Sequence, residues 1–104
     1  MTREVIWVNG AESDLLLIYS RVEGISSGAG DRLMEQAGQF LELLKRQPFM
    51  VRCWLGPVRR VSLHRSGMGL FYVVEPRRLV VIAVLDLRRS PRALRDEIKR
   101  RLPG

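Results

Sequence analysis

The chain contains very little cysteine and histidine, and each shortage excludes a class of protein. Among its 104 residues there is one cysteine, Cys53, and one histidine, His64. A single cysteine forms no internal disulfide, which excludes a disulfide-stapled secreted domain. One cysteine and one histidine also cannot complete a structural zinc site. We therefore expect no metal and no other cofactor.

Long apolar runs are also missing, because no stretch reaches the roughly 18 residues of a membrane-spanning helix. The chain begins Met1-Thr2-Arg3-Glu4, and no long apolar stretch follows, which argues against a signal peptide. We therefore expect a cytoplasmic protein that has no membrane partner. The length predicts a single domain over residues 1–104.

Positive charge is abundant and unevenly distributed. The formal net charge is +7, and sixteen of the eighteen basic residues are arginine. Residues 1–44 hold three basic and seven acidic residues, whereas residues 45–104 hold fifteen basic and four acidic ones. The planar guanidinium of arginine pairs bidentately with carboxylates and phosphates. A partner that carries such groups would therefore contact the C-terminal part; an arginine-rich proteome is the alternative explanation.

The N-terminal half predicts a strand and two helices. Residues 4–8 are mostly β-branched or aromatic, which predicts a strand. Asn9 is a candidate N-cap for the next helix, with Glu12 able to complete a capping box. The apolar stripe of that helix is Ala11, Leu15, Ile18, Val22 and Ile25. A Gly/Ser turn then leads to a second amphipathic helix over about 31–46, so the two form a helical hairpin.

The C-terminal half predicts three strands and a helix. Residues 58–64, 70–74 and 79–87 are strand candidates joined by short turns, which favours an antiparallel meander. The last of these strands is almost wholly apolar and is expected at the centre, buried on both faces. Ser90-Pro91 is an N-cap followed by proline at the first helical position. The predicted fold class is α+β, with the helices on one side of a small antiparallel sheet.

The ordered set of elements and residues resembles the ParE/RelE toxin superfamily of bacterial type II toxin–antitoxin systems. The resemblance extends from about Val5 to Arg92 and favours the ParE branch. The similar segments are Val5-Ile6-Trp7 with Ala11, Asp14-Leu15 and Ile18-Tyr19, then Phe40-Leu41 to Pro48, Arg59-Arg60-Val61, Phe71-Tyr72-Val73-Val74, and Val80 to Leu85 with Arg88-Arg89. It implies an N-terminal strand and helical hairpin packed on the sheet, followed by a C-terminal helix.

The resemblance implies a toxin of the plasmid-stabilisation type that a cognate antitoxin neutralises. ParE-type toxins inhibit DNA gyrase by binding it, which suits a chain rich in arginine with no clear general acid or base. The candidate gyrase contacts are Arg88, Arg89, Arg92 and Arg95, around the exit of the last strand. A solvated helix face is the alternative interpretation of these arginines.

Apolar residues gather in the breaker-rich segment 48–57, which we interpret as part of a groove for an antitoxin helix. Aromatic residues and methionine suit such a surface, and the nearby arginines would complement an acidic antitoxin tail. The candidate antitoxin contacts are Phe49, Met50, Trp54, Arg59 and Arg60. The alternative is a loop folded back on the core.

The alternative function is that of a RelE-type ribosome-dependent mRNA endoribonuclease. Such cleavage must activate a 2′-hydroxyl and stabilise a pentavalent phosphate. The candidate set for it is Arg59, Arg65 and Arg88 around His64, and a His64–Asp86 pair is a further candidate.

Three departures from the family pattern count against an intact active site. RelE-type enzymes usually carry a tyrosine or histidine near the C-terminus, and none follows Tyr72 here. Met68-Gly69 stands where the family often has a basic residue, and Asp86 where it often has a histidine. We therefore expect a protein-binding inhibitor rather than an enzyme, with no small-molecule substrate. A general nucleic-acid binder and a relic without a target are two further alternatives.

Overall fold

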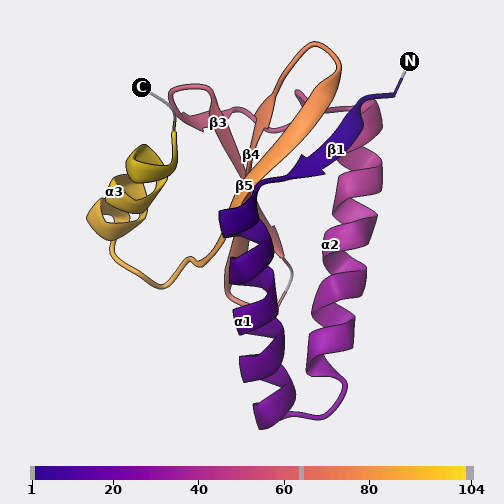
Figure 1. Cartoon of the computed structure of the whole chain (residues 1–104), viewed down its shortest axis with the longest axis vertical. Helices are drawn as coiled ribbons and strands as arrows, with labels where there is room; N and C mark the ends of the chain where they lie inside the picture. The colour runs from indigo at the N-terminus through magenta and orange to yellow at the C-terminus, as the bar shows by residue number, and fades with distance from the viewer. Residues whose placement is uncertain (1, 64, 103–104) are drawn as a thin grey trace.

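The computed structural model describes residues 2–63 and 65–102, and Figure 1 shows how its helices and strands are arranged. In chain order the elements are β1 (Glu4–Trp7), α1 (Asn9–Ile25), α2 (Ala29–Arg46), β2 (Cys53–Leu55), β3 (Val58–Leu63), β4 (Met68–Val74), β5 (Arg78–Asp86) and α3 (Pro91–Arg101). The five strands form one sheet in the order β1-β5-β4-β3-β2. The α+β fold class predicted from the sequence is confirmed.

The sheet is mixed rather than purely antiparallel. Strands β2 to β5 form an antiparallel meander, as predicted. Strand β1 adds to the free side of β5 in parallel, with Trp7 beside Val81. This places β5 between β1 and β4, where its apolar side chains are covered on both faces, as its composition predicted. The short edge strand β2 was not predicted.

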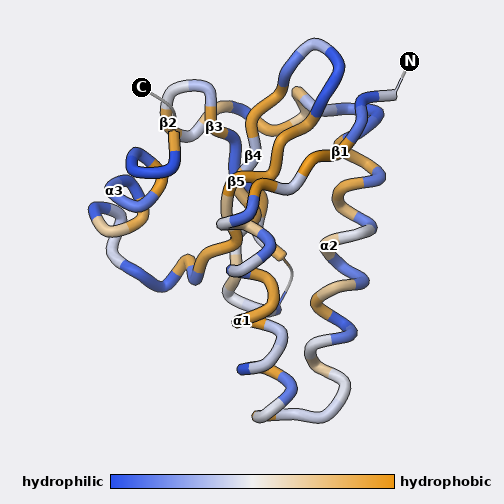
Figure 2. Tube along the Cα trace, viewed as in Figure 1, coloured by the Kyte–Doolittle hydropathy of each residue, from blue (hydrophilic) through white to orange (hydrophobic). Residues whose placement is uncertain are grey.

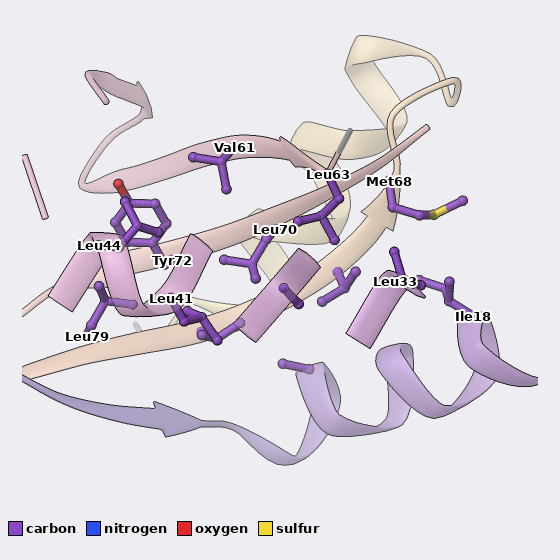
Figure 3. Close-up of a cluster of buried hydrophobic side chains, with 14 residues drawn as sticks. Ile18, Leu33, Leu41, Leu44, Val61, Leu63, Met68, Leu70, Tyr72 and Leu79 are labelled. Carbon is purple, nitrogen blue, oxygen red and sulfur yellow. The ribbon is translucent and has the colours of Figure 1, made fainter. Parts of the chain in front are cut away.

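Helices cover both faces of the sheet, so the prediction that they lie on one side is wrong. Successive residues of a strand point to opposite faces, and β4 carries large apolar side chains on each. Leu70 and Tyr72 face α1 and α2 in the cluster that Figure 3 shows. Phe71 joins Leu94 and Ile98 of α3 in a second buried cluster. We call these two surfaces the hairpin face and the α3 face.

Helix α1 begins directly where β1 ends, and the predicted Asn9 cap is wrong. Val8 occupies the N-cap position without a side-chain bond. Its N–H donates to the carbonyl of Val81 at 3.1 Å, and its carbonyl accepts the N–H of Glu12 at 3.1 Å. The chain is therefore still bonded to the sheet when the helix starts, which leaves Asn9 inside the helix.

The far end of α1 also departs from the predicted apolar stripe. Ala11 and Ile18 are buried, but Ile25 is 80% exposed. Figure 1 shows that the last turn of α1 extends past the sheet, so no strand covers Ile25 there. Of the helices in the part of the chain that the structure describes, none is long and apolar enough to cross a membrane.

Helix α3 begins as the sequence predicts. The Ser90 hydroxyl accepts the N–H of Ala93 at 3.1 Å, and Pro91 is the first helical residue. Leu94 and Ile98 are buried against the sheet, and most of the other side chains are polar and exposed. Figure 2 shows α3 as a largely hydrophilic helix beside the apolar strands.

Candidate functional site

The four arginines predicted to contact a target lie together where β5 leads into α3. Arg88 and Arg89 follow β5, Arg92 and Arg95 lie in the first turns of α3, and all four are exposed. We call them the exit arginines. Figure 2 shows this stretch as strongly hydrophilic. Within the described residues, Arg88 is the one member of the set that forms an ion pair.

Asp86 forms several hydrogen bonds with Arg88. The Arg88 guanidinium donates to both carboxylate oxygens of Asp86, at 2.9 and 2.8 Å. The backbone N–H of Arg88 donates to the same carboxylate at 2.8 Å. These bonds, together with the nearby charge of Arg21, lower the pKa of Asp86 from 3.8 to about 2. Asp86 therefore stays ionised at neutral pH and is engaged by Arg88. His64, the predicted partner of Asp86, lies outside the described residues.

The structure separates the arginines of the predicted nuclease site. Arg65 lies in the β3–β4 turn with φ of 63°, a left-handed conformation that is uncommon outside glycine. Arg88 lies beside this turn, because a Cβ atom on Gly67 would be 3.5 Å from its Nε. Arg59 pairs with Tyr72 in the sheet, four residues along β3 from Leu63. Arg65 therefore lies in the turn beside which Arg88 lies, at one end of the sheet, whereas Arg59 lies further along β3.

Both tyrosines are held in structural contacts. The Tyr72 hydroxyl donates to the carbonyl of Pro48 at 3.1 Å, and burial raises the pKa of Tyr72. The Tyr19 hydroxyl donates to Asp31 at 2.8 Å, and this hydrogen bond raises the pKa of Tyr19. Both tyrosine hydroxyl groups therefore make contacts within the fold.

The predicted antitoxin contacts are divided between the two faces of the sheet. Arg59 and Arg60 are adjacent in β3 and therefore point in opposite directions. On the hairpin face, the Arg59 guanidinium lies 5.0 Å from the centre of the Phe49 ring. On the α3 face, the Arg60 guanidinium lies 5.2 Å from the centre of the Trp54 ring. The segment thus wraps around the edge of the sheet and does not line one groove.

Two hollows were not predicted from the sequence. The larger, of about 500 Å³, lies between the helical-hairpin turn and the β3–β4 turn and is lined by Val22, Ile25, Ser26, Ala29, Arg32, Leu33, Gln36, Arg65 and Ser66. The smaller, of about 70 Å³, includes Arg21 and Arg89 beside Asp86. Ile25, which ends the predicted apolar stripe of the first helix, lines the larger hollow instead of packing in the core.

The ion pair that attaches α3 to α1 was also not predicted from the sequence. Arg101 donates to both oxygens of Asp14, at 2.6 and 3.0 Å, and to the carbonyl of Ile82 at 3.0 Å. Asp14 in turn accepts the N–H of Val84 at 2.9 Å. Arg101 and Asp14 therefore bind backbone groups of β5 at Ile82 and Val84. Both positions follow Val81, the last β5 residue that pairs with β1. The partners are 87 positions apart, so no local sequence pattern indicates their contact.

The described residues thus offer guanidinium groups for binding anions and bring no three metal-ligating side chains together. An exposed guanidinium binds carboxylate or phosphate through paired hydrogen bonds. The exposed arginines can therefore bind a charged surface.

Similar proteins were found by comparison with solved structures and not by comparison of sequences. No protein-family model matches the sequence, and no curated protein matches it. A chain of the chromosomal ParDE TA system from P. aeruginosa aligns with a TM-score of 0.67 and 15% identity, over 80% of this chain and 94% of that one. The E. coli toxin RelE, as a mutant in the free state, aligns with a TM-score of 0.69 and 20% identity, over 98% of this chain and 100% of that one. The chain therefore has the fold of the ParE and RelE toxins, and the two matches do not separate one branch from the other.

Proposed function

We propose that this protein is the toxin of a type II toxin–antitoxin pair and that it inhibits DNA gyrase by binding it. The fold likeness to a ParDE chain and to RelE supports the toxin assignment. The observation that carries the binding mechanism is the set of exit arginines, which are exposed around the turn between β5 and α3. The Asp86–Arg88 bonds and the Ser90 cap fix this turn at its two ends.

The exit arginines suit a target that presents carboxylates or DNA phosphates, because guanidinium groups pair with both. Asp86 is engaged by Arg88, and Glu97 by Arg100 and Arg101, so these carboxylates already have structural partners. This supports an inhibitor that acts by binding. The mechanism we propose is docking on gyrase so that the enzyme is trapped with its DNA cleaved.

The same proposal includes a cognate antitoxin that binds this chain and blocks its action. The similar chain from P. aeruginosa belongs to a ParDE TA system, which supports the expectation of such a partner. The antitoxin contacts proposed here are Phe49, Met50, Trp54, Arg59 and Arg60, and the structure gives each face of the sheet part of this set. A partner that contacts all of them must therefore wrap around the β2 edge.

The test is pulse-labelling of DNA and protein synthesis in bacteria just after induction of this chain alone. The proposal expects DNA synthesis to fall first, with an SOS response, and expects purified protein to inhibit gyrase supercoiling. Replacing Arg89, Arg92 and Arg95 by glutamine is expected to restore growth. The same charge loss at the exposed Arg46, Arg52 and Arg77 is the matched control and is expected to leave toxicity unchanged. Continued growth with the unaltered chain would exclude a toxin function in that host.

The second candidate function is RelE-type cleavage of mRNA on the ribosome. It is favoured by the placement of Arg65 in the β3–β4 turn, beside which Arg88 lies. Under this alternative, protein synthesis falls before DNA synthesis, and Arg65→Ala abolishes the arrest of translation. The order in which the two syntheses fall therefore decides between the two functions.

A further inference from the structure

The larger hollow, of about 500 Å³, combines apolar side chains with positive charge. It lies where the end of α1, the start of α2 and the β3–β4 turn meet. Arg32 of α2 and Arg65 of the turn are both exposed and both line it. Its apolar lining residues are Val22, Ile25, Ala29 and Leu33. Of the described residues that line the hollow, none is acidic, so no lining carboxylate offsets the charge of the arginines.

The apolar wall of the hollow reaches from the core to the solvent. Leu33 is 3% exposed and belongs to the buried cluster of the hairpin face, as do Leu63 and Met68 at the two ends of the β3–β4 turn (Figure 3). Ile25, in contrast, is 80% exposed. A ligand with an apolar body would remove Ile25 from water, which is favourable.

Neither arginine of the hollow forms an ion pair with a carboxylate of the described chain. Two acidic side chains at the hairpin turn have other partners. Glu23 accepts the N–H groups of Gly28 and Gly30, at 3.2 and 2.8 Å. Asp31 accepts the hydroxyl of Tyr19 at 2.8 Å. The acidic groups nearby in the chain are therefore used within the hairpin, and the two guanidinium groups keep their donors for an anion.

Contacts within the chain shape both turns that border the hollow. The Ser66 hydroxyl donates to the carbonyl of Leu63 at 2.7 Å and accepts the N–H of Met68 at 3.0 Å. Nη1 of Arg32 lies against the hairpin turn, since a Cβ atom on Gly28 would be 3.2 Å from it. The hollow is present in the chain without a ligand, as small-molecule sites usually are.

We propose that this hollow binds a small organic anion that has an apolar body and one anionic group. The apolar body covers Ile25 and Leu33, and the anionic group lies on the side of the hollow where Arg32 and Arg65 stand. Guanidinium groups bind carboxylate, sulfonate or phosphate oxygens through charged hydrogen bonds. The volume of the hollow lies within the range of about 300–1,000 Å³ that is typical of small-molecule sites.

The inference goes beyond the proposed function and does not rest on it. The residues that line the hollow include none of the exit arginines and none of the proposed antitoxin contacts. Ligand binding is measured on the purified full chain and does not depend on toxicity. Failure of the ligand site and failure of the toxin function are therefore separate results.

The test compares two fluorescent probes that share one aromatic ring system. Anilinonaphthalene sulfonate carries an anionic group, and phenylnaphthylamine lacks it. The sulfonate is expected to bind about tenfold more tightly, as for two exposed ion pairs. Arg32→Gln combined with Arg65→Gln is expected to remove this preference. Arg46→Gln combined with Arg77→Gln gives the same change in net charge at exposed positions outside the hollow, and is expected to leave the preference within about twofold.

A second pair of variants tests the apolar wall. Ile25→Asn is expected to weaken the binding of both probes about fivefold, because the ligand then covers less apolar surface. Leu16→Asn, at a position of α1 that is 68% exposed and outside the hollow, is the control and is expected to change binding by less than about twofold. Circular dichroism of each variant establishes that the fold is retained.

Three results would overturn the proposal. The first is equal affinity of the unaltered chain for the two probes, and the second is an equal loss of preference in the two double variants. The third is equal weakening by Ile25→Asn and Leu16→Asn. If the NMR signals of Ile25 change on dilution of the protein without a probe, the hollow is instead a contact with a second copy of this chain.

Discussion

Among residues 2–63 and 65–102, fourteen buried residues join the hairpin face of the sheet to α1 and α2, whereas seven make up the cluster beneath α3. The first cluster draws on both helices and on β3, β4 and β5 (Figure 3). In the second, α3 contributes only Leu94 and Ile98. The two faces therefore differ in how much apolar area holds their helices in place, and apolar area is the main source of folding stability.

Polar contacts, in contrast to apolar ones, contribute strongly to the attachment of α3. Arg101 joins α3 to Asp14 of α1 and to the Ile82 carbonyl of β5, and no more than about a fifth of either charged side chain is exposed. Helix α3 is thus attached by a few apolar contacts and one well-bonded ion pair, while the helical hairpin is attached by an extended core. We expect α3, which carries two of the exit arginines, to open before the rest of the domain.

The largest effect is expected from a truncation in the hairpin-face core. Leu44 is fully buried at the end of α2, and Leu44→Ala is expected to lower the free energy of unfolding by about 2–5 kcal/mol. Urea denaturation measures the change. Leu16→Ala, at a position that is 68% exposed on α1, is the control and is expected to change stability by under about 0.5 kcal/mol. Similar losses in the two variants would contradict the proposed dominance of this core.

A smaller and more local effect is expected at the ion pair of α3. Arg101→Met leaves Asp14 largely buried without its partner, and is expected to cost about 1–3 kcal/mol. Hydrogen exchange is expected to accelerate at the amides of α3 and to stay unchanged in α2, because the lost contact joins α3 to α1 and β5 and does not involve α2. Arg100→Met removes an exposed arginine that pairs with Glu97, and is expected to have little effect on exchange. Uniform acceleration across both helices would argue against separate opening of α3.

Acid is expected to weaken the connection between β5 and α3. The pKa of Asp86 is lowered from 3.8 to about 2 in the folded chain. The stabilisation from its ionised form is therefore present above pH 3.8 and is lost as the pH falls toward 2. Asp86→Asn is expected to make stability less dependent on pH across this interval. Titration by NMR measures the pKa of Asp86 in the folded chain. A value near the ordinary 3.8 would rule out Asp86 as the source of this pH dependence.

Local sequence signals were sufficient to predict some helices and strands but not the boundaries of others. The Ser90 hydroxyl bonds to a group three residues away, so the start of α3 could be predicted from its own neighbours. The apolar run of β5 likewise indicated a strand covered on both faces. The predicted Asn9 cap failed because the bond of Val8 to β5 sets where α1 begins. That bond joins positions far apart in the sequence.

In the candidate site, too, the contacts between residues close in the chain could be predicted and those between distant residues could not. The exit arginines are close in the chain, so the sequence could place them on one surface. The contacts of Arg101 with Asp14 and Ile82 depend on which elements become neighbours. The amphipathic pattern of α3 could not predict that this helix lies on the face of the sheet opposite to α1 and α2. Such a pattern shows which side of a helix is buried, but it does not show which other element buries it.

The smallest effect is expected where the α3 face meets the sheet edge. Arg60 lies over the ring of Trp54, and Trp54 packs edge-on against Phe71 with ring centres 5.2 Å apart. Arg60→Gln removes the cation and is expected to cost about 0.5–1 kcal/mol, the value for a partly exposed cation–π contact. Arg52→Gln, an exposed arginine just before β2, is the control with the same charge change. If the two variants lose the same stability, the Arg60–Trp54 contact contributes nothing beyond net charge. The α3 face would then depend on its apolar cluster and on Arg101 alone.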